Sequence, residues 1–338
     1  MTAITAARPT KAIEGGRVSI LGEHFPIDQP RLPSVRVGDA PARVVFASSA
    51  RIDVLVPPGL RAGPAPVRID DVPGQTVVVD IAAPFASGVH QVDNPAFDRS
   101  GNLYVTFSGT RGQQVPVSVF RVTPSGTRET FSSGIVNPTS TALGPDGRLY
   151  VSSRFEGTVY RVSPEGYAEP FATDLGVACG LAFAPDGTLF VGDRSGTIFR
   201  VDPAGKATTF ATLPSSVAAF HLAMAPDGAL FVTGPTLGSY DAIYRLTMEG
   251  GISEFHVGFG RPQGIAFDAH GVLHVVEALA GSSGVYRVRE GAPPELMLSG
   301  PGLVGVAFDA AGTLAVCSND TVYRLPVQSA PHVATLPT

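Results

Sequence analysis

A sequence motif that recurs about every 40 residues constrains the fold of this chain more than any other feature. Its clearest copy, GLAFAPDGTLFVGD at 180–193, reads as two short apolar strands joined by a Pro-Asp-Gly turn. Proline presets the first turn position, aspartate bonds to nearby backbone, and glycine accepts the positive φ that closes the turn. One hairpin of this kind cannot bury its own apolar faces, so it must pack against further copies.

Six copies of the motif align on their turn glycines, with spacings of 46, 40, 41, 43 and 41 residues. Leucine stands two positions after each glycine, valine four positions after it, and alanine five positions before it. The turn glycines are Gly101, Gly147, Gly187, Gly228, Gly271 and Gly312. A third strand of the VYRV type follows each hairpin. Units of about 40 residues with four short strands are typical of propeller blades, so the six copies predict six blades.

The alanine column has a steric interpretation. Side chains alternate between the two faces of a strand, so Ala182 lies on the opposite face from Leu181 and Phe183. A small face on one unit can then pack against a large face on the next at the density of a protein interior. We therefore expect the alanines to lie between neighbouring units.

The first 86 residues lack the repeat but carry short strand and turn signals. EGGRVSILGEHF at 14–25, VRVGDAPARVV at 35–45 and RIDVLVPPG at 51–59 resemble the IPT/TIG family of immunoglobulin-like domains. That resemblance implies a spacer, binding module or dimer contact without chemistry of its own. The sequence thus predicts an all-β protein: a small Ig-like β-sandwich at 1–86, docked without a flexible linker on a six-bladed β-propeller at 87–338.

The strand that completes the last blade has two candidates. The segment 84–86 repeats the spacing of Pro170, Phe171 and Ala172 to their turn glycine. The C-terminal segment 332–336 competes for the same place, and we favour the C-terminal segment.

Residues 87–338 resemble the propellers of the NHL-repeat and senescence-marker-protein/gluconolactonase superfamily, through GLAFAPDGTLFVGD and QGIAFDAHGVLHVVE at 263–277. The lactonases of this superfamily hold a divalent cation such as Ca²⁺ in the column eight residues before the turn glycine. The resemblance implies Asp93 as a metal ligand, because Asp93-Asn94-Pro95 echoes the family's Glu-x-Pro. Cys179 and Gln263 stand where the family has Asn or Asp, which counts against lactonase activity. The full column is Asp93, Thr139, Cys179, Phe220, Gln263 and Val304.

A second column, five or six residues after the glycine, contains Asp193 and Glu277. In each unit the first strand of the hairpin (strand A) starts, and the second (strand B) ends, on one rim of a propeller, so both columns should surround the channel mouth. The two carboxylates are candidates for acid–base catalysis, and the alternative is that each caps backbone or pairs with arginine. Arg154 and Arg194 follow the same strand ends and are candidate ligand-binding residues.

His221 replaces the glycine found at 180, 264 and 305, so its imidazole should face the channel as a base, a ligand or a hydrogen-bonded wall residue. Asn94 and Asn137 each precede a proline on the same rim and are candidate ligand-binding amides or turn residues. Cys179 and Gln263 complete the candidate ligand-binding set. Nothing near Cys179 in sequence lowers its pKa, which favours an inert thiol.

Composition narrows the range of partners. The net charge is −5 and no basic block occurs, which argues against nucleic acid. Neither a signal-peptide core nor a membrane-length apolar run is present, so we expect a cytoplasmic protein that does not bind membranes. Cys179 and Cys317 fall on opposite sides of the expected ring and should be free thiols. The sequence does not set the oligomeric state.

Three functions are compatible with these patterns. The first is recognition of a small molecule or a protein at the channel mouth, which the neutral and apolar residues of the first column favour. The second is metal-assisted hydrolysis of a lactone or ester, with Asp93 at the metal and Asp193, His221 or Glu277 moving protons. The third is a metal-independent lyase or hydrolase that uses His221 with a rim carboxylate. We favour recognition, and the chain is an enzyme only under the second or third hypothesis.

Overall fold

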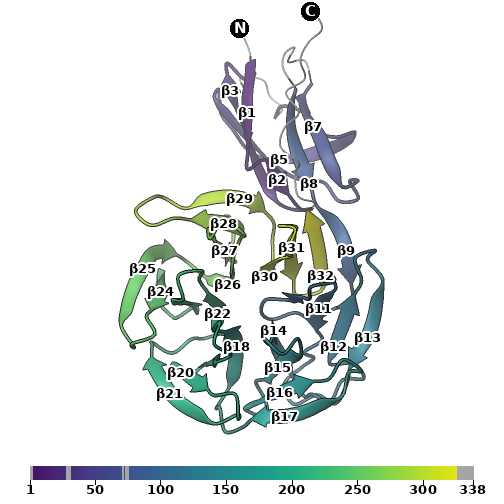
Figure 1. Cartoon of the computed structure of the whole chain (residues 1–338). Coiled ribbons are helices and arrows are strands. Elements are labelled where there is room, and N and C mark those ends of the chain that lie inside the picture. The colour runs from purple at the N-terminus through teal and green to yellow at the C-terminus, as the bar shows by residue number, and fades with distance from the viewer. Residues whose placement is uncertain (1–2, 28–31, 71, 73–75, 326–338) are drawn as a thin grey trace, which may run out of the picture.

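The structure, a computed structural model, describes residues 3–27, 32–70, 72 and 76–325, and the account below concerns those residues. Strands and turns make up the described chain, as the sequence predicts. A ring of strands carries a smaller group of strands on one side (Figure 1). No helix among the described residues has the length and apolar character that crossing a membrane requires.

The N-terminal group contains eight strands around one apolar cluster that includes Val18, Ile20, Ile52 and Val54. Neighbouring strands are joined edge to edge in the order β1-β3-β6-β5-β4-β7-β8-β2, so the group is one continuous sheet rather than two separate ones. The strands are β1 (Ala3–Arg8), β2 (Lys11–Ala12), β3 (Arg17–Glu23), β4 (Val35–Val37), β5 (Ala40–Ala47), β6 (Arg51–Leu55), β7 (Gly63–Ile69) and β8 (Val77–Ile81).

The repeats form antiparallel four-stranded units, as expected from the hairpin motif. The first three units are β10 (Ala96–Phe97), β11 (Leu103–Thr106), β12 (Val119–Val122) and β13 (Arg128–Ser132); β14 (Pro138–Leu143), β15 (Leu149–Ser153), β16 (Thr158–Val162) and β17 (Ala168–Ala172); and β18 (Ala178–Phe183), β19 (Leu189–Asp193), β20 (Thr197–Val201) and β21 (Ala207–Thr212). The next two are β22 (His221–Met224), β23 (Leu230–Thr233), β24 (Asp241–Leu246) and β25 (Ile252–Phe259); and β26 (Pro262–Phe267), β27 (Leu273–Glu277), β28 (Gly284–Val288) and β29 (Glu295–Ser299). The last unit has β30 (Leu303–Phe308), β31 (Leu314–Ser318) and β32 (Thr321–Leu325).

The sequence predicted six separate blades, and the described residues form five separate four-stranded sheets. The difference lies in the fifth repeat, because β29 also pairs in parallel with β2 and so joins β26–β29 to the N-terminal strands in one 12-stranded sheet. Lys11 and Ala12 bridge β8 on one side and β29 on the other. The innermost strand of this repeat, β26, still lies between β22 and β30 in the ring. The N-terminal strands are thus hydrogen-bonded to the ring.

The prediction that residues 332–336 complete the last unit is wrong. The fourth strand of that unit is β9 (Ala83–Ser87), which pairs antiparallel with β32, and the segment 332–336 lies outside the described residues. The backbone beyond β9 continues the junction, with Gln91 N donating to Asn319 O at 3.0 Å. The beginning and end of the ring therefore close on each other through main-chain hydrogen bonds.

Small residues separate the units, as the alanine column predicts. Ala96, Ala142, Ala182, Ala223 and Ala266 each pack against the apolar cluster centred on the next unit along the chain. The resulting interfaces carry edge-to-face aromatic pairs, for example Tyr150 with Phe183 at 4.8 Å between ring centroids. The rigid ring that results fixes the strand ends around its axis.

The closing pair can be tested with a cross-strand disulfide. Ser87 and Thr321 are direct partners in the β9–β32 ladder, and opposed antiparallel residues lie within disulfide reach. We expect Ser87→Cys/Thr321→Cys to form a disulfide under mild oxidation and to raise the urea midpoint, since the bond restrains the unfolded chain. Peptide mapping by mass spectrometry and urea unfolding measure both effects. Thr321→Cys alone is the control, and failure of the pair to cross-link would contradict closure by β9.

One interface position differs from the others. His274 stands three residues after its turn glycine, where four other units have Tyr104, Tyr150, Phe190 or Phe231. It is buried, stacks edge-on against Phe308 at 4.8 Å, and uses Nδ1 against the carbonyl of Val272. Burial lowers the pKa of His274 to about 4, because a charged imidazole would lose its hydration there.

This shift predicts acid sensitivity. The unfolded chain protonates His274 below about pH 6.5 while the folded chain does not, so stability falls as the pH drops from 6.5 towards 4. The contribution is at most roughly 3 kcal/mol, from the conversion of a pKa shift to free energy. We expect His274→Phe, which restores the ring found in the other units, to reduce this slope in urea unfolding measured from pH 7 to pH 4.5. An unchanged slope relative to the parent protein would contradict the prediction.

Candidate functional site

Strand registers place the candidate residues on one rim of the ring. The start of strand A meets the end of strand B in each of two neighbouring units, through Pro138 paired with Ser153 and Ala178 paired with Asp193. The Pro-Asp-Gly turns join the other ends of the same strands and therefore lie on the opposite rim. Both candidate columns thus gather around the axis on one side, as the sequence predicts.

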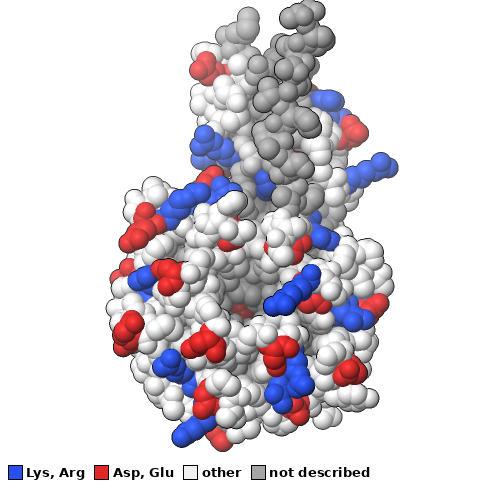
Figure 2. Space-filling model, viewed as in Figure 1, with Lys and Arg blue, Asp and Glu red and all other residues white. Residues whose placement is uncertain are grey.

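A cavity of about 370 Å³ opens at this mouth. Of the sequence-predicted residues, it brings together Thr139, Cys179, Gln263 and Val304 from the first column with Arg154 and Arg194 from the strand ends. The remaining walls come from His90, Gln91, Val92, Val177, Val217, Ala218, Ala219 and Asn319. The centre of the ring is visibly hollowed in the space-filling view, where acidic and basic side chains are otherwise mixed around the circumference (Figure 2).

Asp93 and His221 form a buried pair across the ring axis. His221 Nδ1 is hydrogen-bonded to Asp93 Oδ1, and the side chains are 0% and 1% exposed. Asp93 enters the first unit and His221 begins β22 of the fourth, so the pair joins opposite sides of the ring. His221 Nε2 is buried without a hydrogen-bond partner among the described residues. The pair occupies the axis next to Gln91 and Val92, which line the cavity.

The residues present do not fit the divalent cation that the resemblance implies. A hard cation takes six to eight oxygen ligands, but the Asp93 carboxylate is bound by an imidazole. The described residues contain no group of three His, Cys, Asp or Glu that could hold a metal ion. The other members of the column are a thiol, an amide, a hydroxyl and two apolar side chains. We therefore derive no metal-dependent step from this site.

The two rim carboxylates are not brought together. Asp193 accepts a hydrogen bond from the backbone N–H of Val177 at 2.8 Å and another from the hydroxyl of Ser195. Glu277 accepts three backbone N–H bonds, from Gly260, Arg261 and Leu279. Neither carboxylate lines the cavity. Each fixes the loop of its own unit, which is the capping role weighed as the alternative to catalysis.

The two asparagines also act on the backbone. Asn94 accepts from Val306 N–H and donates to Ile265 O, and Gly264 and Gly305 leave room for it because a Cβ at either would lie within 2.2–2.4 Å of Asn94 or Asp93. Asn137 is fully buried and uses its amide to hold the long loop after β11.

That asparagine accepts from Gly112 N–H at 2.6 Å and donates to the carbonyls of Ser108 and Thr110 at 2.6 and 2.7 Å. Its φ of 46° suits asparagine, which enters the left-handed region more readily than most residues. Asn94 and Asn137 thus shape the mouth, and neither amide lines the cavity.

Positive charge dominates the cavity wall. Burial lowers the pKa of Arg154, and the nearby cations Arg194 and Arg111 lower it further against an opposing effect of Cys179. The pKa of His90 is lowered by burial and by Arg154. Among the described residues no carboxylate pairs with these three arginines. The mouth therefore holds one partly desolvated cation, Arg154, near the exposed Arg194 and Arg111, and none of the three has a carboxylate partner among the described residues.

Cys179 is a thiol held in its protonated form. Burial raises its pKa to about 12, and its Sγ–H donates to Val177 O at 3.2 Å. Cys179 and Cys317 are both free and buried, as the sequence predicts. Cys179 thus contributes shape to the cavity wall rather than a nucleophile.

Phe220 is the member of the first column that leaves the mouth. In β14, β18, β26 and β30 the pairing shifts near the strand start, whereas β22 pairs regularly from His221 to Met224. Phe220 consequently packs in the apolar cluster between units, close to Gly192 and Gly234, and Ala219 lines the cavity instead. A bulge of this kind leaves little trace in sequence.

Sequence reasoning missed Asn319, which stands seven residues after its turn glycine, as Arg154 and Arg194 do. Extending that column to all six repeats would have found it. His90 and Gln91 precede the first repeat, and no repeated column points to them.

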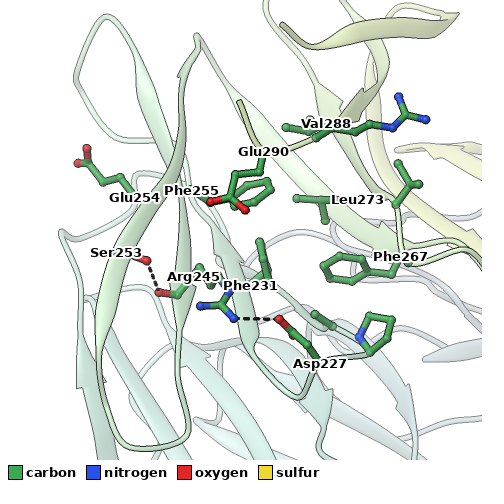
Figure 3. Close-up of a pocket in the computed structure, with 15 residues that line it drawn as sticks. Asp227, Phe231, Arg245, Ser253, Glu254, Phe255, Phe267, Leu273, Val288 and Glu290 are labelled. Atoms are coloured by element: carbon green, nitrogen blue, oxygen red, sulfur yellow. Dashed lines mark hydrogen bonds and ion pairs between the residues drawn. The ribbon is translucent and has the colours of Figure 1, made fainter. Parts of the chain in front are cut away.

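A larger cavity, of about 730 Å³, lies elsewhere (Figure 3). It opens between the fourth and fifth units on the side of the Pro-Asp-Gly turns, where Arg245 is paired with Asp227 at 2.8 Å. Between other units, glycines in the turn from the third to the fourth strand close the gap: Gly166 and Gly205 lie against the carbonyls of Phe131 and Phe171. At the corresponding Gly291, nothing approaches within 4 Å of the Cβ position. The cavity is thus an unfilled seam, and both of its arginines have a carboxylate partner, Arg245 with Asp227 and Arg289 with Glu295. The mouth, with its unpaired cations, is the better candidate site.

Solved structures share this fold at low sequence identity. A gluconolactonase from Xanthomonas campestris aligns at 17% identity and TM-score 0.58, covering 88% of this chain and 99% of that one. Virginiamycin B lyase from Staphylococcus aureus aligns at 18% and 0.52, covering 88% and 95%. An auxiliary nutrient binding protein from Bacteroides ovatus aligns at 14% and 0.55, covering 97% and 98%. No protein-family model matches the sequence, and no curated protein matches it. The chain is thus a β-propeller with neighbours of gluconolactonase and streptogramin lyase type.

The axial pair predicts strong coupling between Asp93 and His221. Removing one partner leaves the other buried and unpaired, so we expect His221→Ala and Asp93→Ala each to lower the free energy of unfolding by about 3–5 kcal/mol. The double variant should cost less than the sum by more than about 1 kcal/mol, because it leaves no orphaned group. Urea unfolding at pH 7 completes the cycle. Strictly additive losses would contradict the pairing.

Proposed function

We propose that this protein binds a small organic anion at the channel mouth. The observation that carries the proposal is Arg154, a half-buried cation of the cavity wall without a protein counter-ion, with the exposed Arg194 and Arg111 near it. A carboxylate or phosphate placed between the guanidinium groups would replace the missing counter-ion and form charge-assisted hydrogen bonds. The chain as a whole carries a net charge of −5, so the positive charge at the mouth is opposite in sign to that of the protein.

The size and lining of the cavity support the same reading. About 370 Å³ is within the range of small-molecule sites, and Thr139, Gln263 and Asn319 add neutral polar groups to the wall. One propeller neighbour that covers nearly all of this chain is described as an auxiliary nutrient binding protein, which agrees with recognition. Metal-assisted hydrolysis of a lactone or ester rests on fold likeness alone, since the residues around Asp93 do not suit a divalent cation.

We also propose how many blades the ring has and what the N-terminal strands do. We infer that β26–β29 serves as the sixth blade, since β26 contacts the inner strands of both neighbouring units. The N-terminal strands then act as an immunoglobulin-like module of IPT/TIG type, hydrogen-bonded to the ring through β2. If the N-terminal strands bind a partner, this attachment would fix the orientation of the channel mouth relative to that partner.

Calorimetry tests anion binding. We expect carboxylates and inorganic phosphate, but not the matching amides, to bind the full chain at low ionic strength. Arg154→Gln and Arg194→Gln should each weaken binding about tenfold or more, because a hydrogen bond to a charged group contributes roughly 1.5–3 kcal/mol. Arg161→Gln is the matched control, since Arg161 pairs with Glu169 away from the cavity. Equal affinity of all three variants for the anion, or no anion binding at all, would contradict the proposal.

A further inference from the structure

Apolar side chains are exposed around the same mouth. Of the large hydrophobic residues of the ring that are exposed, five lie in loops that follow a strand B or precede a strand A. These residues are Phe155, Val217, Leu237, Tyr240 and Leu279. Both kinds of loop are on the rim that carries the cavity. Most of the exposed large hydrophobic residues of the ring are therefore on the rim that carries the cavity.

The loop between β23 and β24 presents the most exposed of these side chains. Leu237 is 93% exposed and Tyr240 is 69% exposed. The base of the loop is nevertheless held in place, because Asp241 Oδ1 accepts from both the N–H and the hydroxyl of Thr236, at 3.0 and 2.6 Å. Hydrogen bonds therefore fix the base of the loop, while the apolar side chains at its tip are exposed to solvent.

Hydrogen bonds connect this loop to the cavity wall. The backbone N–H of Val217, which lines the cavity, donates to Pro235 O at 2.8 Å, and the hydroxyl of Ser216 donates to the same carbonyl at 2.9 Å. Val217 is itself 42% exposed. These bonds hold the cavity wall at Val217 beside the start of the loop that carries Leu237. In the second unit, Phe155 follows directly after the cavity residue Arg154.

We propose that the ligand of the mouth is a soluble amphiphilic anion, whose carboxylate or phosphate enters the cavity and whose hydrocarbon part lies over Val217, Leu237 and Tyr240. The inference rests on the proposed function and specifies its ligand class. The arginines supply charge complementarity for the head, and the apolar rim loses water when the hydrocarbon covers it. The net charge of −5 opposes docking on an anionic membrane, which favours a free molecule over a lipid surface.

A homologous series of carboxylates tests the inference. Calorimetry on the full chain with acetate, butanoate, hexanoate and octanoate should show affinity rising with chain length, with octanoate at least about tenfold tighter than butanoate. Leu237→Ser and Tyr240→Ser should flatten this rise and leave butanoate affinity unchanged. Arg154→Gln should weaken every member of the series by a similar factor. Ile252→Ser, at an exposed residue that begins β25 on the opposite rim, is the control and should change nothing.

The outcomes separate this inference from the proposed function. Affinity that is independent of chain length would overturn the amphiphile and leave anion binding intact. Absence of binding by any carboxylate or phosphate would overturn both. Sedimentation with vesicles containing phosphatidylglycerol that is lost in Leu237→Ser, together with a flat carboxylate series, would replace the soluble ligand by a membrane surface.

Discussion

Closure of the ring by β9 against β32 is the constraint on which the rest of the structure depends. A circle of packed units leaves two strand edges and two unpacked faces until its ends meet, and each exposed edge would carry unpaired backbone groups. Here the closing strand comes from the beginning of the repeat region, and the bond from Gln91 N to Asn319 O extends the junction towards the axis. Because β8 and β9 are separated by one residue, closure also fixes the N-terminal strands beside the ring.

The axis follows from that closure. Glycine at 180, 264 and 305 lets the inner strands approach closely, and the freed space is taken by Asn94 from the first unit and His221 from the fourth. Asn94 joins β26 to β30, and the Asp93–His221 pair joins opposite sides. Neighbouring inner strands are linked further by Ser152 Oγ donating to Cys179 O and Thr233 Oγ1 donating to Gln263 O, both at 2.6 Å. The mouth is therefore a shallow, rigid cup over a filled axis rather than an open pore.

The sequence predicted what repeats and missed what occurs once. Six aligned copies determine the strands, the alanine interfaces and the rim on which the candidate residues gather, because the same local pattern is tested six times. Three features each depend on one local or long-range pairing that occurs once in the chain. They are the closing strand β9, the regular pairing of β22 that turns Phe220 inward, and the β2–β29 bridge that joins one unit to the N-terminal sheet. No column of a repeat records such contacts. The sequence could offer backbone capping by Asp193 and Glu277 only as an alternative to catalysis, because a carboxylate at the end of a strand gives the same sequence pattern in both roles.

The chemistry of the mouth follows from which polar groups the scaffold has already used. Most of the acids and amides predicted to act on a ligand already form hydrogen bonds within the protein. The backbone bonds Asp193, Glu277, Asn94 and Asn137, and His221 bonds Asp93. The guanidinium groups of Arg154 and Arg194 remain without a counter-ion beside a wall that is otherwise neutral. Arg194 is exposed, but Arg154 is half-buried, and a partly desolvated cation is costly when no carboxylate pairs with it. Catalysis by a rim acid and base would require the ring to give up the bonds that hold its loops, whereas binding an anion requires no rearrangement and relieves the repulsion between the arginines.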